Sequence, residues 1–306
     1  MPAVTPPPEL LTVRDFLRFA VSSFRKARLV HGHGATSALD EAAFLILETL
    51  HLPVDDINPW LDTRLGVEER QALGDIIRQR IETRKPAAYL TRRTYIHGVP
   101  FYVDERVIVP RSFIGELMFS GLFGGEDASL IEAPENAASV LDLCTGSGCL
   151  AILAAGIFPN AKIDAVELSE DALEVARINV SEHDLASRIN LLRSDLFTAV
   201  EGQTYDLIIT NPPYVSNAEA AAFPPEYAHE PVMAHVGGKD GLDIVRRILD
   251  RAAGHLNPGG GLLCEIGEGR GILASEYPHF DFLWLDTEES QGEVFWLTRE
   301  QLTLSL

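Results

Sequence analysis

Cysteine is scarce in this chain. Three residues of this type, Cys144, Cys149 and Cys264, occur among 306. Three thiols cannot form a disulfide framework, and their spacing lacks the paired pattern of a zinc site. The sequence therefore excludes the small disulfide-rich proteins and predicts no metal ligands.

Long apolar runs are also missing. No stretch of about 18 apolar residues occurs, which argues against a membrane-spanning helix. The first eight residues, Met1 to Pro8, lack the basic-then-apolar order of a secretory signal peptide. Hydrophobic residues still make up 46% of the chain and charged residues 23%, which is typical of a globular protein. We expect a cytoplasmic protein long enough for two domains.

Positive charge is sparse in the second part of the chain. Residues 1–110 contain 14 Lys/Arg and 14 Asp/Glu. The remaining 11 Lys/Arg and 31 Asp/Glu, and with them the whole net charge of −20, belong to residues 111–306. A surface of this kind repels a phosphate backbone and attracts a basic partner. The alternative explanation is that the acidity serves solubility alone.

The N-terminal part has helical periodicity. Apolar residues between Glu9 and Val30 recur at the spacing of one helical face. Ser37-Ala-Leu-Asp40 resembles a capping box before a second helix that ends near Pro53. Val67 to Thr83 is a further amphipathic segment, stopped by Pro86. We expect residues 1–92 to form a helical domain that recognises the substrate.

The pattern changes twice after these helices. Short apolar runs between Tyr95 and Val109 surround His97-Gly98 and predict a β-hairpin, so we expect a hairpin linker over residues 93–110. From residue 111 to 306, strand-like and helix-like segments alternate, which predicts an α/β, Rossmann-like domain with a parallel sheet covered on both faces.

The elements of this second domain can be assigned from their periodicity. The expected strands are Ser139–Asp142, Lys162–Glu167, Ile189–Leu192, Tyr205–Thr210, Gly261–Ile266, Phe280–Leu285 and Glu293–Leu297. The expected helices are Cys149–Ile157, Asp171–Glu182 and Gly241–Leu256. The last two strands leave no room for a helix between them, so we expect them to form an antiparallel hairpin at one edge of the sheet.

A glycine turn follows the first of these strands. Val140-Leu-Asp-Leu-Cys-Thr-Gly-Ser-Gly148 runs directly into the first helix, and Gly146 and Gly148 let the backbone approach a ligand closely. No phosphate-binding lysine follows, which excludes a P-loop. The acidic Asp142 disfavours a pyrophosphate and suits a cationic sulfonium with its amino acid moiety.

Two further strands also end in acidic residues. Glu167 lies 25 residues after Asp142, where a carboxylate can accept hydrogen bonds from both ribose hydroxyls. Asp195 ends the third strand region and could accept from an adenine amino group, with Leu196 and Phe197 as apolar cover for the ring. A single acid at a strand end is usually a solvated loop charge. Three at successive strand ends favour a nucleoside site.

The fourth strand runs into Asn211-Pro-Pro-Tyr214. Ligands of such sheets bind beyond the carboxyl ends of the strands. The prolines stiffen the backbone and remove two N–H donors, so the Asn211 carboxamide oxygen and the Pro212 carbonyl can accept the two hydrogens of a substrate –NH2 group. Tyr214 offers a flat face to the planar group. An ordinary Asn-Pro turn is the alternative.

Together these motifs resemble a known family. Asp142–Gly148 and Asn211–Tyr214 look like the corresponding segments of the seven-stranded (class I) methyltransferases that modify amino or amide nitrogens. Phe101-Tyr-Val-Asp-Glu-Arg-Val-Ile-Val-Pro-Arg111 is similar to the linker of the protein-(glutamine-N5) methyltransferases. The fuller resemblance, from roughly residue 10 to the end, is to the branch that modifies large-subunit ribosomal protein three. The segments that carry it are Val109-Pro-Arg-Ser112, Glu116-Leu117, Tyr227-Ala-His-Glu-Pro231, Asp240-Gly-Leu-Asp-Ile-Val-Arg-Arg-Ile-Leu249 and Val294-Phe-Trp-Leu-Thr-Arg-Glu-Gln-Leu302.

The resemblance implies methyl transfer from S-adenosylmethionine to the side-chain amide nitrogen of a glutamine, giving N5-methylglutamine and S-adenosylhomocysteine without a metal. The cofactor-binding residues it implies are Asp142, Cys144, Thr145, Gly146, Ser147, Gly148, Glu167, Leu168, Asp195, Leu196 and Asn211. The acceptor residues it implies are Asn211, Pro212, Pro213 and Tyr214, with Arg111 beside them. Cys144 stands where many methyltransferases have glycine and Phe113 where this branch commonly has proline. We interpret Cys144 as a small packing residue rather than a nucleophile.

Several alternatives stay open. The release-factor branch shares the chemistry but typically has Pro-Arg-Pro and an acidic pair where this chain has Ser112-Phe113. Nucleic-acid amino-methyltransferases share the tetrapeptide, although the acidic domain disfavours DNA. A non-catalytic ribosome-assembly factor of the same fold is the third possibility. The expected partner is a basic ribosomal protein. A basic run, Arg78, Arg80, Arg84, Lys85, Arg92 and Arg93, predicts either a ribosomal RNA contact or a solvated helix face.

Overall fold

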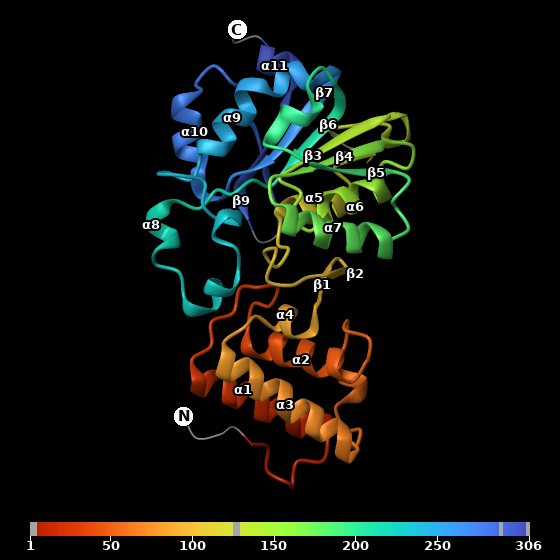
Figure 1. Cartoon of the computed structure of the whole chain (residues 1–306), viewed down its shortest axis with the longest axis vertical. Coiled ribbons are helices and arrows are strands. Elements are labelled where there is room, and N and C mark those ends of the chain that lie inside the picture. The colour runs from red at the N-terminus through yellow and green to blue at the C-terminus, as the bar shows by residue number, and fades with distance from the viewer. Residues whose placement is uncertain (1–4, 125–128, 288–289, 304–306) are drawn as a thin grey trace. The chain divides into compact units, whose positions relative to one another are not determined.

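The computed structural model describes residues 5–124, 129–287 and 290–303. The chain divides into two compact units, which Figure 1 shows with their elements. The helical unit contains the residues up to Glu105 together with Phe223–His229, and the catalytic unit contains 106–222 and 230–306. Across the described residues, no helix is both long and apolar enough to cross a membrane.

The helical unit is built from four helices. They are α1 (Val13–Ala27), α2 (Ala38–Thr49), α3 (Val67–Thr83) and α4 (Ala87–Thr91), with 3-10 turns η1 (Asn58–Trp60) and η4 (Pro225–His229). The helix predicted over 67–83 is confirmed at both ends. Thr12 and Ser37 cap α1 and α2 through hydrogen bonds from the backbone N–H groups of Asp15 and Asp40. Phe16, Phe24 and Ile77 are among the fully buried side chains of its core.

The predicted hairpin is present in two of its three apolar runs. Strands β1 (Arg93–Ile96) and β2 (Val99–Tyr102) pair antiparallel, with Ile96 opposite Val99. His97 and Gly98 both have positive φ, at 47° and 79°, as a tight two-residue turn requires. The third run, around Val107, forms no strand.

The catalytic unit contains one sheet of seven strands in the order β5-β4-β3-β6-β7-β9-β8. Their bounds are β3 Ser139–Leu143, β4 Lys162–Glu167, β5 Ile189–Arg193, β6 Tyr205–Thr210, β7 Leu256–Glu265, β8 Leu283–Asp286 and β9 Gln291–Thr298. The first five in this order are parallel, whereas β9 is antiparallel to β7 and to β8. The predicted Rossmann-like sheet and its antiparallel edge hairpin are confirmed.

Helices cover both faces of this sheet. They are α5 (Phe113–Phe119), α6 (Cys149–Ile157), α7 (Glu170–Glu182), α8 (Asn217–Ala220), α9 (Asp243–Ala252), α10 (Arg270–Glu276) and α11 (Arg299–Thr303). The 3-10 turns are η2 (Pro134–Asn136), η3 (Leu196–Val200), η5 (Val232–Ala234), η6 (Ala253–His255) and η7 (Gly267–Gly269). Figure 1 shows α6 and α7 on one face, with α9 on the other.

The predicted bounds of three elements are wrong. Strand β7 begins at Leu256 rather than Gly261, because Leu256 already pairs with Tyr205 of β6 across an irregular register. The helix predicted over 241–256 is correspondingly shorter, and the predicted strand over 280–285 begins three residues late, at Leu283. The short helices α5, α8, α10 and α11 of this unit were not predicted.

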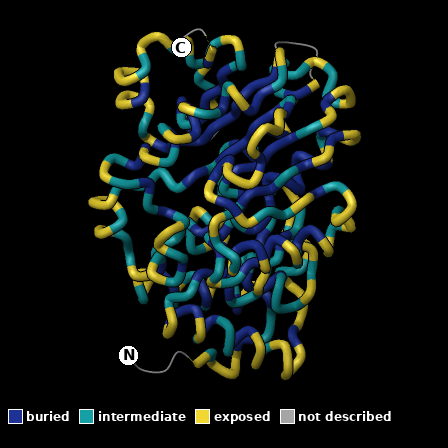
Figure 2. Tube along the Cα trace, turned by 45° about the horizontal axis from the view of Figure 1, so that its top comes forward, coloured by how far each residue is buried: buried dark blue, intermediate teal, exposed yellow. Residues whose placement is uncertain are grey.

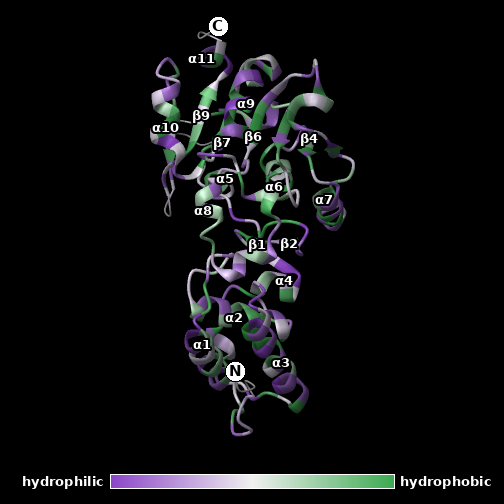
Figure 3. Ribbon diagram, turned by 60° about the vertical axis from the view of Figure 1, so that its left-hand side comes forward, coloured by the Kyte–Doolittle hydropathy of each residue, from purple (hydrophilic) through white to green (hydrophobic). Residues whose placement is uncertain are grey.

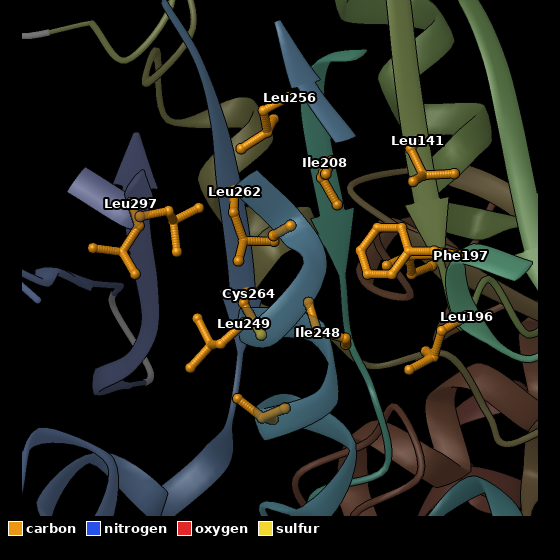
Figure 4. Close-up of a cluster of buried hydrophobic side chains, with 14 of the residues drawn as sticks. Leu141, Leu196, Phe197, Ile208, Ile248, Leu249, Leu256, Leu262, Cys264 and Leu297 are labelled. Carbon is orange, nitrogen blue, oxygen red and sulfur yellow. The ribbon is translucent and has the colours of Figure 1, made fainter. Parts of the chain in front are cut away.

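Burial and hydropathy follow the sheet. Buried segments run along the strands and exposed ones along the connecting loops (Figure 2), and β6 and β9 stand out as hydrophobic (Figure 3). The core on the α9 side joins Ile248 and Leu249 of α9 to Leu141, Ile208 and Leu262 of three strands (Figure 4). This packing holds the carboxyl ends of β3, β4 and β6 in place beside one another.

Candidate active site

A cavity of about 440 Å³ opens at the carboxyl ends of β3, β4 and β6. Its volume lies within the roughly 300–1,000 Å³ typical of small-molecule sites. The predicted site residues that line it are Cys144, Gly146, Glu167, Leu168, Asp195, Leu196, Asn211 and Pro213. Apolar residues from a later segment of the chain, including Pro231, Met233, Val236 and Ile244, complete the wall.

The glycine turn leaves room for a ligand at one position. Cys144, Gly146 and Gly148 have φ values of 59°, 56° and 81°, and Gly148 caps α6. A Cβ atom on Gly146 would meet no protein atom within 4 Å, whereas one on Gly148 would lie 3.3 Å from the Cβ of Ala176. Gly146 therefore borders the open cavity, and Gly148 allows α6 to approach α7. Burial raises the pKa of the Cys144 thiol, which suits packing rather than nucleophilic attack.

Asp142 lies beneath this turn and does not line the cavity. Its carboxylate accepts hydrogen bonds from Thr145 Oγ1 at 2.5 Å and from the backbone N–H of Ala151 at 3.0 Å. The side chain is fully buried, and this burial raises its pKa to about 7. Asp142 and Thr145 thus hold the turn against the start of α6. Ser147 and Gly148 do not line the cavity either. The N–H of Gly148 donates to the carbonyl of Thr145 at 2.9 Å, and the carbonyl of Ser147 accepts from Asn179 Nδ2 at 2.8 Å.

Glu167 points its carboxylate at the turn from the end of β4. Oε2 accepts from the N–H of Gly146 at 3.0 Å, and Oε1 accepts from the N–H groups of Leu168 and Ser169, both at 2.9 Å. A carboxylate has about four acceptor positions, so these three bonds orient the group and leave capacity for a hydroxyl donor. This arrangement suits a ribose.

The third strand end contributes differently from the prediction. Asp195 forms an ion pair with Arg247, with 2.8 Å between Oδ2 and Nη2, and Leu196 lines the cavity. Phe197 was expected to cover a ring but is wholly buried in the core, where it stacks on His255 with 4.4 Å between ring centroids. Leu196 and Leu168 therefore supply the apolar contact at this end.

The carboxamide of Asn211 is held through its NH2 group. Its Nδ2 donates to the carbonyl oxygen of Arg111 at 3.3 Å, which turns the NH2 group toward the linker and leaves Oδ1 as the free acceptor. Pro213 lines the cavity and Pro212 is buried beside it. An acceptor oxygen at the edge of a ligand cavity can bind a substrate –NH2 group.

Tyr214 is fixed by a residue that the sequence analysis missed. Its hydroxyl donates to Glu265 Oε1 at 2.9 Å, while Glu265 Oε2 accepts from Ser112 Oγ at 2.6 Å and from the N–H of Phe113 at 2.9 Å. Burial raises the pKa of Glu265 to about 7 and that of Tyr214 well above its ordinary value. Glu265 ends strand β7, so the strand-end acid signal used for Glu167 would also have found it.

Three further glycines press against the acceptor tetrapeptide. A Cβ atom on Gly237 would lie 2.4 Å from the carbonyl oxygen of Pro213, and one on Gly241 would lie 2.1 Å from that of Tyr214. A Cβ atom on Gly267 would lie 2.8 Å from two carbons of the Tyr214 ring. Only glycine allows these approaches. These contacts fix the backbone and the ring of the tetrapeptide, and no local pattern in the sequence indicates them.

The predicted acceptor residue Arg111 is engaged within the protein. Its Nη1 and Nη2 lie 2.9 and 2.8 Å from the two carboxylate oxygens of Glu230, which also accepts from the N–H of Val109 at 2.8 Å. His235 Nε2 lies 3.0 Å from the same carboxylate. The carbonyl of Arg111 reaches Asn211, so this residue positions the acceptor site through its backbone.

The basic run of the helical unit is largely paired. Arg80 is wholly buried and bonds to Glu41 at 2.7 Å, and Arg84 pairs with Glu226 at 2.5 Å. Arg78 and Lys85 pair with Asp75 and Glu105. Much of the run therefore stabilises this unit, and a contact with ribosomal RNA stays a prediction.

The chain is similar to several known proteins. The family model described as methyltransferase small domain matches residues 128–223. The ribosomal protein uL3 glutamine methyltransferase of Bradyrhizobium diazoefficiens is 55% identical over 295 residues, covering 96% of this chain and 92% of that protein. Those of Neisseria gonorrhoeae and Burkholderia pseudomallei are 52% and 50% identical, covering 96% and 97% of this chain and 96% and 98% of theirs. Among solved structures, the hMettl16 catalytic domain in complex with MAT2A 3'UTR hairpin 6 has a TM-score of 0.48 at 17% identity, covering 72% of this chain and 80% of that one.

Proposed function

The chain belongs to the family of ribosomal protein uL3 glutamine methyltransferases, and from this premise we propose how its residues act on the glutamine. The enzyme transfers a methyl group from S-adenosylmethionine to the side-chain amide nitrogen of a glutamine in uL3, the large-subunit ribosomal protein three. The products are N5-methylglutamine and S-adenosylhomocysteine. The observation that carries the assignment of roles is the Asn211 carboxamide, held through its NH2 group with its oxygen left as an acceptor at the cavity.

The cavity fits the cofactor. The space beside Gly146 would accept the amino acid portion, Glu167 would accept a hydrogen bond from the ribose, and Leu168 and Leu196 would cover the adenine beside Asp195. The carboxylate of Glu167 at the cavity favours a cationic ligand. S-adenosylmethionine supplies an activated methyl group on a sulfonium. The protein's own task is to place the acceptor nitrogen in line with it.

The acceptor residues make a poor nucleophile reactive by orienting it. An amide lone pair is delocalised into its carbonyl, so hydrogen bonds from the two amide hydrogens to Asn211 Oδ1 and the Pro212 carbonyl help most when they favour the less delocalised nitrogen of the transition state. The face of Tyr214 restrains the amide plane. Orientation of this kind supplies roughly 7–11 kcal/mol of barrier reduction in favourable cases. One hydrogen of the amide is replaced by methyl.

The substrate assignment can be tested directly. Purified enzyme is incubated with methyl-labelled cofactor and either unmodified uL3 or an unmodified release factor, the substrate of the rival branch. We expect label in uL3, with the mass gain of one methyl for one hydrogen on a glutamine-containing peptide. Labelling of the release factor alone would refute the proposed substrate. Cofactor binding without methylation of either protein would favour a non-catalytic assembly factor.

A basic substrate also suits the charge of the catalytic unit. Residues 111–306 carry 31 acidic and 11 basic residues, which attract a ribosomal protein and oppose a nucleic-acid backbone. We include in the proposal that the helical unit takes part in substrate recognition.

A further inference from the structure

One segment of the acceptor loop belongs to the helical unit. The loop leaves strand β6 at Asn211 and returns to the cavity wall at Pro231. Between these points, Phe223–His229 packs as part of the helical unit, although its flanks on both sides belong to the catalytic unit. The loop that presents the acceptor groups is therefore tied to the helices at its far end.

Glu226 is the anchor of this segment. Its side chain is fully buried, its Oε1 accepts from the N–H of Val30 at 3.0 Å, and the same oxygen lies 2.5 Å from Arg84 Nη2. Arg84 follows α3 and also donates to the carbonyl of Arg28 at 2.9 Å, just beyond α1. One carboxylate thus joins the acceptor loop to the ends of two helices.

The surrounding residues form a socket for the segment. The Tyr227 ring lies 4.3 Å from that of His33 and 4.5 Å from that of Phe223, between ring centroids. A Cβ atom on Gly32, whose φ is +143°, would lie 3.0 Å from the Tyr227 hydroxyl oxygen. His229 Nε2 lies 2.9 Å from the carbonyl oxygen of Thr83. The contacts to the rest of the helical unit come from Glu226, Tyr227 and His229, so the C-terminal half of the segment is held.

A buried carboxylate is unusual in a connecting loop. Removing its charge from water is unfavourable unless hydrogen-bond and ion-pair partners replace the water. Among the described residues of this unit, one other buried carboxylate forms an ion pair, that of Glu41 with Arg80. This pair joins two helices of the unit's own core. Glu226 differs because it belongs to a loop whose two flanks are part of the catalytic unit.

The two legs of the loop transmit this restraint toward the active site. The N–H of Val215 donates to the carbonyl of His235 at 2.8 Å, and the N–H of Gly237 donates to that of Val215 at 2.9 Å. Asn217 and Gly238 form a similar bond at 2.9 Å. Tyr214 immediately precedes this paired region, so release of the far end of the loop would loosen the acceptor tetrapeptide.

We propose that Glu226 is a positioning residue for methyl transfer, because it anchors the far end of the loop whose beginning presents the acceptor groups. The expected effect on turnover rests on the proposed function. The expected effect on loop mobility does not, because mobility can be measured without a substrate.

The test compares Glu226→Gln and Glu226→Ala with the matched variants Glu41→Gln and Glu41→Ala. Amide hydrogen exchange is followed over residues 215–222 and 230–238, and turnover is measured with uL3 and with a short peptide containing its glutamine. We expect Glu226→Ala to speed exchange in both legs and to lower kcat at least about tenfold on both substrates, with Glu226→Gln intermediate. Any loss of cofactor affinity should be smaller than the loss of kcat, although part of the second leg lines the cavity. The Glu41 variants should speed exchange in the helices only.

Several outcomes would overturn the inference. One is unchanged hydrogen exchange in the two legs of the loop, and another is an equal effect of the Glu41 variants on these legs. A third is loss of activity with uL3 while the peptide is methylated normally, because Glu226 would then be a docking residue. Should Glu226→Ala fail to fold, His229→Ala removes a peripheral bond and must show the same changes in smaller size. A wild-type enzyme inactive on uL3 would refute the proposed function, while the exchange result would still decide whether Glu226 restrains the loop.

Discussion

At the residue scale, two asparagines of the catalytic unit perform similar tasks. Asn211 donates its NH2 group to the carbonyl of Arg111, and the buried Asn179 donates its own to the carbonyl of Ser147 in the glycine turn, at 2.8 Å. Each carboxamide braces a loop. They differ in that Asn211 itself lines the cavity.

This difference predicts opposite kinetic effects. Asn211→Ala should lower kcat by about 10²–10³-fold, the usual loss for one hydrogen-bonding group that acts on the transition state, and should change the cofactor Kd little. Asn179→Ala should instead weaken cofactor binding, because the glycine turn loses its brace. Steady-state kinetics with calorimetric titration of the cofactor separate the two. A drop in cofactor affinity for Asn211→Ala as large as its drop in kcat would contradict the assigned role.

Glu265 gives the residue scale a second prediction, in the pH dependence of stability. Burial raises the pKa of its carboxyl from 4.5 to about 7, so the folded state holds a proton that the unfolded state releases between these values. The free energy of unfolding contributed by this group is therefore fully present below about pH 4.5 and declines as the pH rises to about 7. Glu265→Gln should remove this decline, as denaturant titrations between pH 5 and 8 will show.

The matched variant is Asp142→Asn, because burial raises the pKa of Asp142 to about 7 as well. Each single variant should flatten the pH profile in part, and the double variant should be the flattest. A Glu265→Gln profile as steep as that of the wild type would show that this carboxyl does not titrate in the window.

At the element scale, the turn that follows β7 sets the position of Tyr214. Gly267 has a φ of +56°, and a Cβ atom there would meet the tyrosine ring at 2.8 Å. Gly267→Ala should therefore displace the ring, lower kcat at least about tenfold and leave cofactor affinity near that of the wild type, since a displacement of about 1 Å can cost 10²-fold.

Gly271 is the control for this substitution. It lies four residues further on, in α10, and a Cβ atom there would meet no atom within 4 Å. Gly271→Ala should keep full activity and slightly raise the melting temperature, because alanine favours helix over glycine. Equal activity losses in both variants would mean that the region tolerates no change, and would remove Tyr214 from the explanation.

Much of the element order was predictable, because its signals are local. Helices α3 and α6 and strands β4 and β6 occur at their predicted bounds, each marked by an apolar run and a stop signal. The start of β7 was not predictable, because the segment from Asn257 to Gly260 has weak strand propensity. It joins the sheet only through the pairing of β7 with β6.

Some residues of the site could also be predicted from local patterns, whereas their long-range contacts could not. Strand-end residues such as Glu167 and Asn211 are recognisable from their place after an apolar run. Glu265 and Gly267 contact Tyr214 from more than fifty residues away, and Glu226 holds a loop by reaching helices far earlier in the sequence. No local pattern records such contacts, because they depend on how the chain folds back on itself. The role of Arg111 in the acceptor site stays a prediction, and its pairing with Glu230 became visible only in the structure.

At the scale of the whole molecule, charge is unevenly divided, and this division makes a prediction about substrate capture. The 31 acidic residues of 111–306 face only 11 basic ones in that part of the chain. Long-range attraction to a basic substrate weakens as salt shortens the Debye length from about 10 Å at 0.1 M to about 3 Å at 1 M. The KM for uL3 should therefore rise several-fold across this range while kcat changes little.

A short, neutral glutamine peptide is the control for this effect, since it carries no charge for the field to attract. Its KM should be nearly independent of salt, which excludes a general effect of salt on the active site. The competing explanation is that the acidity serves solubility alone. It predicts equal salt dependence for uL3 and for the peptide, together with precipitation of the enzyme once acidic residues remote from the cavity are replaced by their amides. Under the attraction that we expect, those same replacements would leave the enzyme in solution and raise the KM for uL3 in low salt, because capture depends on the summed field rather than on any single side chain.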